Sequence, residues 1–62
     1  MNAGELRKLR KKLGWSQAHL AREVGVATNS VARWERGEMA ISEPAARLIQ
    51  RIANDPKVKP NG

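Results

Sequence analysis

Apolar residues recur along the chain at intervals of three and four, which is the spacing of one face of an α-helix. Four segments show this spacing, and polar residues or glycines separate them. The positions predicted to be buried are Leu6, Leu9 and Leu13, then Leu20, Ala21 and Val24, then Val31 and Trp34, and finally Ala45, Leu48, Ile49 and Ile52. The intervening stretch 38–41 is too short for a strand with a partner. The pattern therefore predicts an all-α chain of four short helices.

Residue types that favour helix ends bound the first and last of these segments. Asn2 is suited to cap the first helix, and Glu5 follows three residues later in the arrangement of a capping box. That helix is expected to end near Gly14. Ser42 is a good cap for the last helix, with Pro44 in its first turn, where a missing amide proton costs little.

The middle of the chain, from Gln17 to Gly37, has the layout of two helices joined at one glycine, which is a helix-turn-helix. Ser16 is a favourable cap for the first of these helices. Gly25 suits a left-handed helix stop, because glycine enters that conformation without steric strain. The second helix has a polar face that contributes little to a core but suits the base edges and phosphates of a duplex. This face consists of Thr28, Asn29, Ala32, Arg33 and Arg36.

On these residues the chain resembles the phage-repressor type of helix-turn-helix, the Cro and cI or XRE family. That family places a leucine and a small residue in the first helix, glycine in the turn, an aliphatic residue in the second helix and a Trp-Glu-x-Gly ending. The matching residues here are Leu20, Ala21, Gly25, Val31 and Trp34-Glu35-Arg36-Gly37. The resemblance covers the chain from Glu5 to about Ala53. It implies a small four-helix, lambda-repressor-like domain that inserts residues 28–36 in the major groove of double-stranded DNA.

Base reading and phosphate contact are assigned to different residues of this segment. The residues expected at base edges are Thr28, Asn29, Ala32 and Arg33. Asn29 can pair with adenine and Arg33 with guanine, while Ala32 permits close approach to a thymine methyl. The residues expected at phosphates are Ser16, Gln17, Ser30 and Arg36. For Gln17 the resemblance implies that its side chain contacts the DNA backbone and braces the reading helix; an ordinary surface glutamine is the alternative.

Two questions about the reading helix stay open at this point. Ala27 occupies the position where the family commonly has a capping Ser or Thr. The helix therefore either lacks a cap or begins one residue later with Thr28 as its cap. From spacing alone, the polar face is also as consistent with an ordinary solvated surface as with DNA contact; the family resemblance favours DNA.

Arg10 and Glu35 lie on the core side of their predicted helices, where charges seldom occur alone. The resemblance implies that they form a structural ion pair between the first helix and the reading helix. Two unrelated charges at the core boundary are the alternative. Arg7, Lys8, Lys11 and Lys12 lie mostly off the apolar stripe of the first helix, either as solvated surface or in contact with phosphates.

Length and composition agree with a single small domain. The chain has 62 residues, a net charge of +6 and a pI near 10.9, which favours a polyanionic partner. Residues 1–54 are predicted to form the domain. Residues 55–62, in which Asp, Pro, Lys and Gly dominate, are predicted to be a disordered tail. With no signal peptide, no apolar run of membrane length and no cysteine, we expect no membrane association and a cytoplasmic location.

Catalytic and metal chemistry have little support in the sequence. His19 is the only histidine, and no acidic residue or cysteine stands at triad or ligand spacing from it. Trp15 directly follows Gly14 and is expected to fold back on the edge of the core. We therefore expect no catalytic residue, no metal site and no cofactor, and the chain is not predicted to be an enzyme.

The sequence thus predicts a DNA-binding transcriptional regulator, or the DNA-binding part of one. The first alternative is an antitoxin, which would bind a protein toxin as well as its own operator. The second is an interaction module that keeps the fold without binding DNA. The four apolar faces are needed for one core, so the chain is predicted to be a monomer in solution that pairs, if at all, on DNA.

Overall fold

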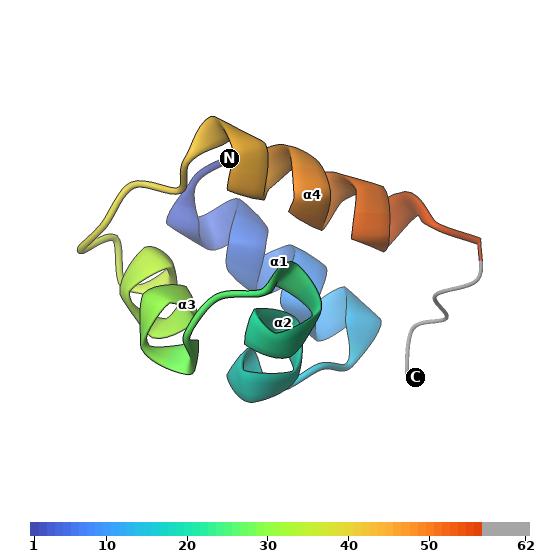
Figure 1. Cartoon of the computed structure of the whole chain (residues 1–62), viewed down its shortest axis with the longest axis horizontal. Helices are drawn as coiled ribbons and strands as arrows, with labels where there is room; N and C mark the ends of the chain where they lie inside the picture. Colours follow the sequence, from blue (N-terminus) through green and yellow to red (C-terminus); the bar gives the residue numbers. More distant parts are fainter. Residues whose placement is uncertain (57–62) are drawn as a thin grey trace.

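The computed structural model describes residues 1–56, which form four α-helices and no strand (Figure 1). The helices are α1 (Ala3–Leu13), α2 (Gln17–Val24), α3 (Thr28–Glu35) and α4 (Glu43–Asn54). The predicted all-α, four-helix fold is confirmed. The domain was predicted to end at Asn54, which is the last residue of α4. Most of the tail predicted to be disordered, residues 57–62, lies outside the described residues.

The helix ends form where local side chains can satisfy the free backbone groups. At the start of α1, Asn2 Oδ1 accepts the Glu5 amide proton at 2.8 Å, and the Asn2 amide donates to Glu5 Oε1 at 3.1 Å. This is the predicted capping box. The Ser42 hydroxyl accepts the Ala45 amide proton at the start of α4. Helix α1 ends at Gly14 in the left-handed conformation, with φ of 71°.

Helix α3 begins without a side-chain cap, which settles where this helix starts. Ala27 is the N-cap residue, with extended backbone angles, and no side chain accepts a hydrogen bond there. Thr28 is the first helical residue rather than the cap. The turn before it is made by Gly25, with φ of 85°. A cap that fails to form costs about 1 kcal/mol, so packing has to stabilise this end of α3.

The core lies where all four helices meet. Its buried residues are Leu6, Leu13, Trp15, Leu20, Ala21, Val31, Trp34 and Ile49. Helix α2 packs against α3 and α4, and α1 packs against α3. In Figure 1, α4 spans the top of the view, and α2 and α3 lie below it. Because α3 gives one side to this core, its opposite side is left facing outward. No helix among residues 1–56 has the length and hydropathy needed to span a membrane.

The prediction that Leu48 is buried is wrong. Its side chain is 37% exposed, whereas its neighbour Ile49 is 1% exposed. Successive helical residues point about 100° apart, and α4 is covered along one side only. Ile49 occupies the centre of that side with Ala45 and Ile52 partly buried beside it, so Leu48 faces away from the core.

Candidate nucleic-acid interface

The polar face of α3 is directed away from the core. Thr28, Asn29 and Arg33 are exposed, while Ala32 is half-buried. On the other side of the same helix, Val31 is fully buried. The four residues predicted to read bases thus share one side of a short helix whose opposite side is held in the core. Ser30, predicted at a phosphate, is half-buried at the edge of this face.

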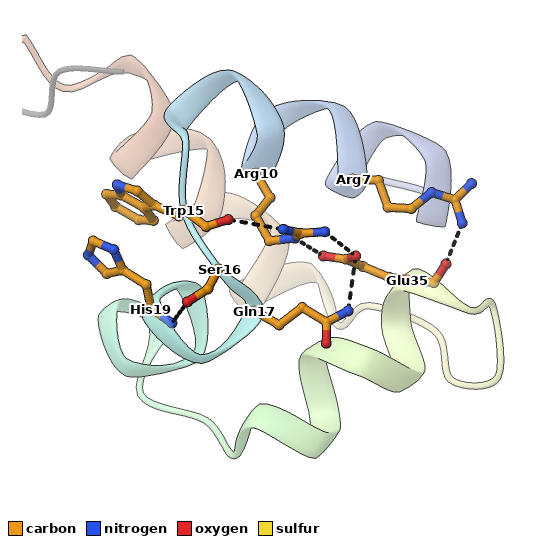
Figure 2. Close-up of polar contacts among 7 residues, drawn as sticks. All are labelled: Arg7, Arg10, Trp15, Ser16, Gln17, His19 and Glu35. Atoms are coloured by element: carbon orange, nitrogen blue, oxygen red, sulfur yellow. Dashed lines mark hydrogen bonds and ion pairs between the residues drawn. The ribbon is translucent and has the colours of Figure 1, made fainter. Parts of the chain in front are cut away.

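Two residues predicted at phosphates stand at the start of α2, where Ser16 is the N-cap and Gln17 is the first helical residue (Figure 2). The Ser16 hydroxyl accepts the His19 amide proton at 3.0 Å and so caps the helix, as predicted. Gln17 is half-buried, and its Nε2 donates to Glu35 Oε1 at 3.2 Å. This hydrogen bond links the start of α2 to the end of α3. The sequence predicted that Gln17 braces the reading helix but did not identify Glu35 as its partner.

Arg10 and Glu35 face each other in a two-point ion pair (Figure 2). Arg10 Nε lies 2.5 Å from Glu35 Oε2, and Arg10 Nη2 donates to Glu35 Oε1 at 2.9 Å. The third guanidinium nitrogen, Nη1, donates to the Trp15 carbonyl at 3.0 Å. The side chain of Glu35 is 4% exposed and that of Arg10 is 17% exposed. The planar guanidinium matches a carboxylate in this geometry, which fixes the angle between α1 and α3.

The protonation of Glu35 reflects two opposing influences. Burial by itself raises the pKa of the carboxyl, because it disfavours the charged form. Hydrogen bonds from Arg10 and Gln17, together with the charges of Arg10 and Arg7, outweigh burial and hold the pKa below its ordinary value. The hydrogen bond to Glu35 likewise raises the pKa of the Arg10 guanidinium. Both groups are therefore charged at neutral pH.

Arg7 is a contributor that sequence reasoning assigned to the outer surface. Its Nη1 donates to the main-chain carbonyl of Glu35 at 2.8 Å (Figure 2). The last carbonyls of a helix lack partners within the helix, so this bond satisfies the C-terminal end of α3. The spacing of the sequence could have indicated this contact, because Arg7 lies three residues before Arg10 and therefore on the same side of α1. Arginines on this side tie α1 to both the side chain and the backbone of Glu35.

Arg36 has a partner that bears on its predicted phosphate contact. Its Nε lies 2.5 Å from Glu38 Oε2, and the two side chains are 57% and 55% exposed. Exposed pairs of this kind contribute little to stability and exchange partners readily. Arg36 is therefore accessible to a phosphate, but Glu38 competes for the same guanidinium.

Trp15 and His19 contact each other beside the start of α2, where Trp15 is buried and His19 is half-buried. Trp15 lies at the edge of the core, as predicted, and its ring stacks on His19 with centroids 4.2 Å apart. The prediction that no carboxylate stands at ligand spacing from His19 is wrong: Glu23 lies one helical turn further along α2, with its Oε1 3.7 Å from His19 Nε2. Among residues 1–56, no three His, Cys, Asp or Glu side chains gather closely enough to hold a metal ion.

Two helices joined at a left-handed glycine, with the second exposed along one polar face, define the chain as a helix-turn-helix domain. Comparison with known families agrees. The model of the helix-turn-helix family matches residues 6–62, and the chain belongs to this family. The resemblance to its XRE type is thereby confirmed.

Relatives with similar sequences are each provisionally named an HTH-type transcriptional regulatory protein. One from Pyrococcus furiosus is 44% identical over 55 residues, which are 89% of this chain and 18% of the relative. One from Thermococcus kodakarensis is 37% identical over 60 residues, or 97% of this chain and 19% of the relative. The chain thus spans less than a fifth of the length of these relatives. No solved structure matches the chain.

Proposed function

We propose that the chain binds double-stranded DNA through the major groove and serves as the DNA-binding part of a transcriptional regulator. The observation that carries this proposal is the presentation of α3. On its polar face Thr28, Asn29 and Arg33 are exposed. The end of α3 is held through Glu35, which accepts hydrogen bonds from Arg7, Arg10 and Gln17. A rigidly held helix with free hydrogen-bonding side chains is what base reading needs. Family membership and the names of the relatives support the same role.

In this proposal the exposed residues of α3 divide into two groups. Thr28, Asn29, Ala32 and Arg33 read base edges, with Asn29 and Arg33 the main determinants of specificity. One helical turn separates these two residues, so they can reach neighbouring base pairs. Ser16, Gln17, Ser30 and Arg36 contact phosphates on either side. The activity is binding, and none of these roles requires catalysis.

The charge of the surface supports a phosphate-lined partner. The chain has a net charge of +6, and three lysines of α1 are exposed: Lys8, Lys11 and Lys12. Cations that neutralise phosphates release counterions, which makes affinity fall as salt rises. No observation on residues 1–56 favours the antitoxin alternative, and the names of the relatives do not point to a toxin partner.

Selection of bound duplexes from a random pool tests the proposal most directly. The expected result is enrichment of a short motif, followed by binding whose log-log salt slope has a magnitude of about 0.9 per phosphate neutralised. No enrichment, together with binding that is insensitive to salt, would contradict DNA recognition. That outcome would favour an interaction module that keeps the fold without using DNA.

A further inference from the structure

Glu35 connects the start of α2 to the ion pair in the interior. Its Oε1 accepts hydrogen bonds from both Arg10 Nη2, at 2.9 Å, and Gln17 Nε2, at 3.2 Å. Figure 2 shows the amide nitrogen of Gln17 turned toward Glu35 and the amide oxygen turned away. Gln17 is also the first residue of α2, next to the Ser16 cap. One carboxylate thus contacts a side chain at the core boundary and a side chain at the proposed phosphate site.

The chemistry of the two groups fixes the orientation of the amide. An ionised carboxylate only accepts hydrogen bonds, whereas a glutamine amide has an oxygen that accepts and a nitrogen with two protons to donate. Glu35 therefore selects the orientation with nitrogen inward. One amide proton is used at Glu35, and the second is left to donate to a phosphate oxygen. A freely rotating glutamine would lose side-chain entropy on ordering at the phosphate, and an oriented one loses less.

The charges around Glu35 make this arrangement compatible with DNA. A lone carboxylate beside a phosphate would repel it. Here Arg10 pairs with the carboxylate at two points, and Arg7 donates to the backbone of the same residue. The group of Arg7, Arg10 and Glu35 has one more positive than negative charge, so Glu35 can orient Gln17 without adding net repulsion.

We propose that Glu35 is a positioning residue for DNA binding: it orients the Gln17 amide in the free protein as the phosphate contact of α2 requires. This inference rests on the proposed function. It assigns the Arg10–Glu35 pair a second role besides tying α1 to α3, because the same carboxylate presets a contact on α2. The single side chain of Glu35 then fixes the position of the Gln17 amide relative to α3.

A double-mutant cycle on DNA affinity tests the inference. The first change is Arg10→Met with Glu35→Leu, which removes the carboxylate while leaving the net charge unchanged; the second is Gln17→Ala. If Glu35 acts through Gln17, the loss of affinity from the first change should be about 2- to 10-fold larger in the Gln17 background than after Gln17→Ala. A purely structural Glu35 would give the same loss in both backgrounds, and that result would overturn the inference. The matched control is Glu43→Leu with Arg47→Met, which removes an exposed ion pair of α4. It should show no coupling to Gln17.

A second measurement on the free parent protein needs no variant. In NMR spectra, one Nε2 proton of Gln17 is expected downfield of exposed glutamines and should move when acid protonates Glu35. Ordinary shifts that do not depend on pH would overturn the inference even if DNA binding is intact. Should the apolar pair variant fail to fold, Glu35→Gln replaces it in the cycle. Its amide can accept or donate, so Gln17 is held less strictly, and a smaller coupling of the same sign is expected. If the parent chain binds no selected duplex, the proposed function is refuted and the inference with it. If the parent binds but the affinity losses of the two changes are additive, only the inference is refuted.

Discussion

Arg10 of α1 and Glu35 of α3, 25 residues apart in the chain, form a bidentate ion pair at the boundary of the core. The Glu35 side chain is almost completely buried, and Arg10 is mostly buried. Breaking such a pair from one side leaves a buried charge without its partner, which costs far more than the pair itself contributes. Changes to this ion pair should therefore affect both the stability of the domain and the position of α3.

Replacing Arg10 by methionine should therefore destabilise the domain strongly. We expect a loss of about 3–5 kcal/mol in the free energy of unfolding, measured by chemical denaturation, because Glu35 would be left buried and charged. Changing both residues to apolar ones, Arg10→Met with Glu35→Leu, should recover much of this loss. The control is Arg47→Met, which breaks an exposed pair with Glu43 and should change stability little. A single Arg10→Met variant as stable as the parent would contradict the structural role.

Acid should destabilise the domain through Glu35. Its folded-state pKa lies below the ordinary value of about 4.3, so Glu35 contributes stability that is fully present above pH 4.3 or so and is lost as the pH falls through its folded pKa. Urea denaturation between pH 7 and pH 3 should show this decline. In Glu35→Gln the decline should be shallower, since the titrating group is gone. A parallel decline in parent and variant would assign the acid sensitivity to other carboxylates.

Two arginines of the reading segment should have different effects on DNA binding. Arg33→Ala should cost about 1–3 kcal/mol and relax the preference mainly at one base pair, because Arg33 is assigned to a base edge. Arg36→Ala should weaken all sequences alike and reduce the salt slope by about one. Binding titrations on the selected site and on single-base variants of it distinguish the two. Equal patterns of loss would refute the division into base and phosphate contacts.

The uncapped start of α3 offers a stabilising substitution. Ala27 already has the extended backbone angles of an N-cap, with φ of −69° and ψ of 146°. Ala27→Ser supplies an oxygen for the free amides of the first turn and should stabilise the domain by about 1 kcal/mol, seen as a higher melting temperature. Ser16→Ala is the opposite control and should lower it, because Ser16 caps α2. No gain from Ala27→Ser would mean that another group satisfies those amides.

The free chain is predicted to be a monomer at micromolar concentration. Large apolar side chains exposed on residues 1–56 are Met39 and Leu48, each 37% exposed. These fall far short of the ~800 Å² per partner that a stable interface buries. Pairing would then occur on DNA, with half-sites about 34 Å apart on one side of the duplex. Sedimentation of the free protein, followed by titration onto one half-site and onto an inverted repeat, measures both parts. A stable dimer without DNA would place an interface at the 38–44 loop or on α4.

Much of the fold was predictable because the interactions that start and stop its helices are local. The capping box of Asn2 and Glu5, the Ser16 and Ser42 caps and the turn at Gly25 each depend on residues within a few positions. The apolar spacing identified all eight buried core residues except Trp15, whose place at the core edge was inferred from the preceding Gly14. The position of Arg10 and Glu35 on core faces, read with the family resemblance, predicted their pairing.

Tertiary structure decided the features that depend on where distant elements meet. Whether α3 begins at Thr28 could not be read from Ala27 alone, because packing outweighs a missing cap of about 1 kcal/mol. Leu48 has the spacing of a core residue, but the narrow cover over α4 leaves it exposed. The bonds from Arg7 and Gln17 to Glu35 join long side chains with many rotamers across 28 and 18 residues, so only the packed helices select them.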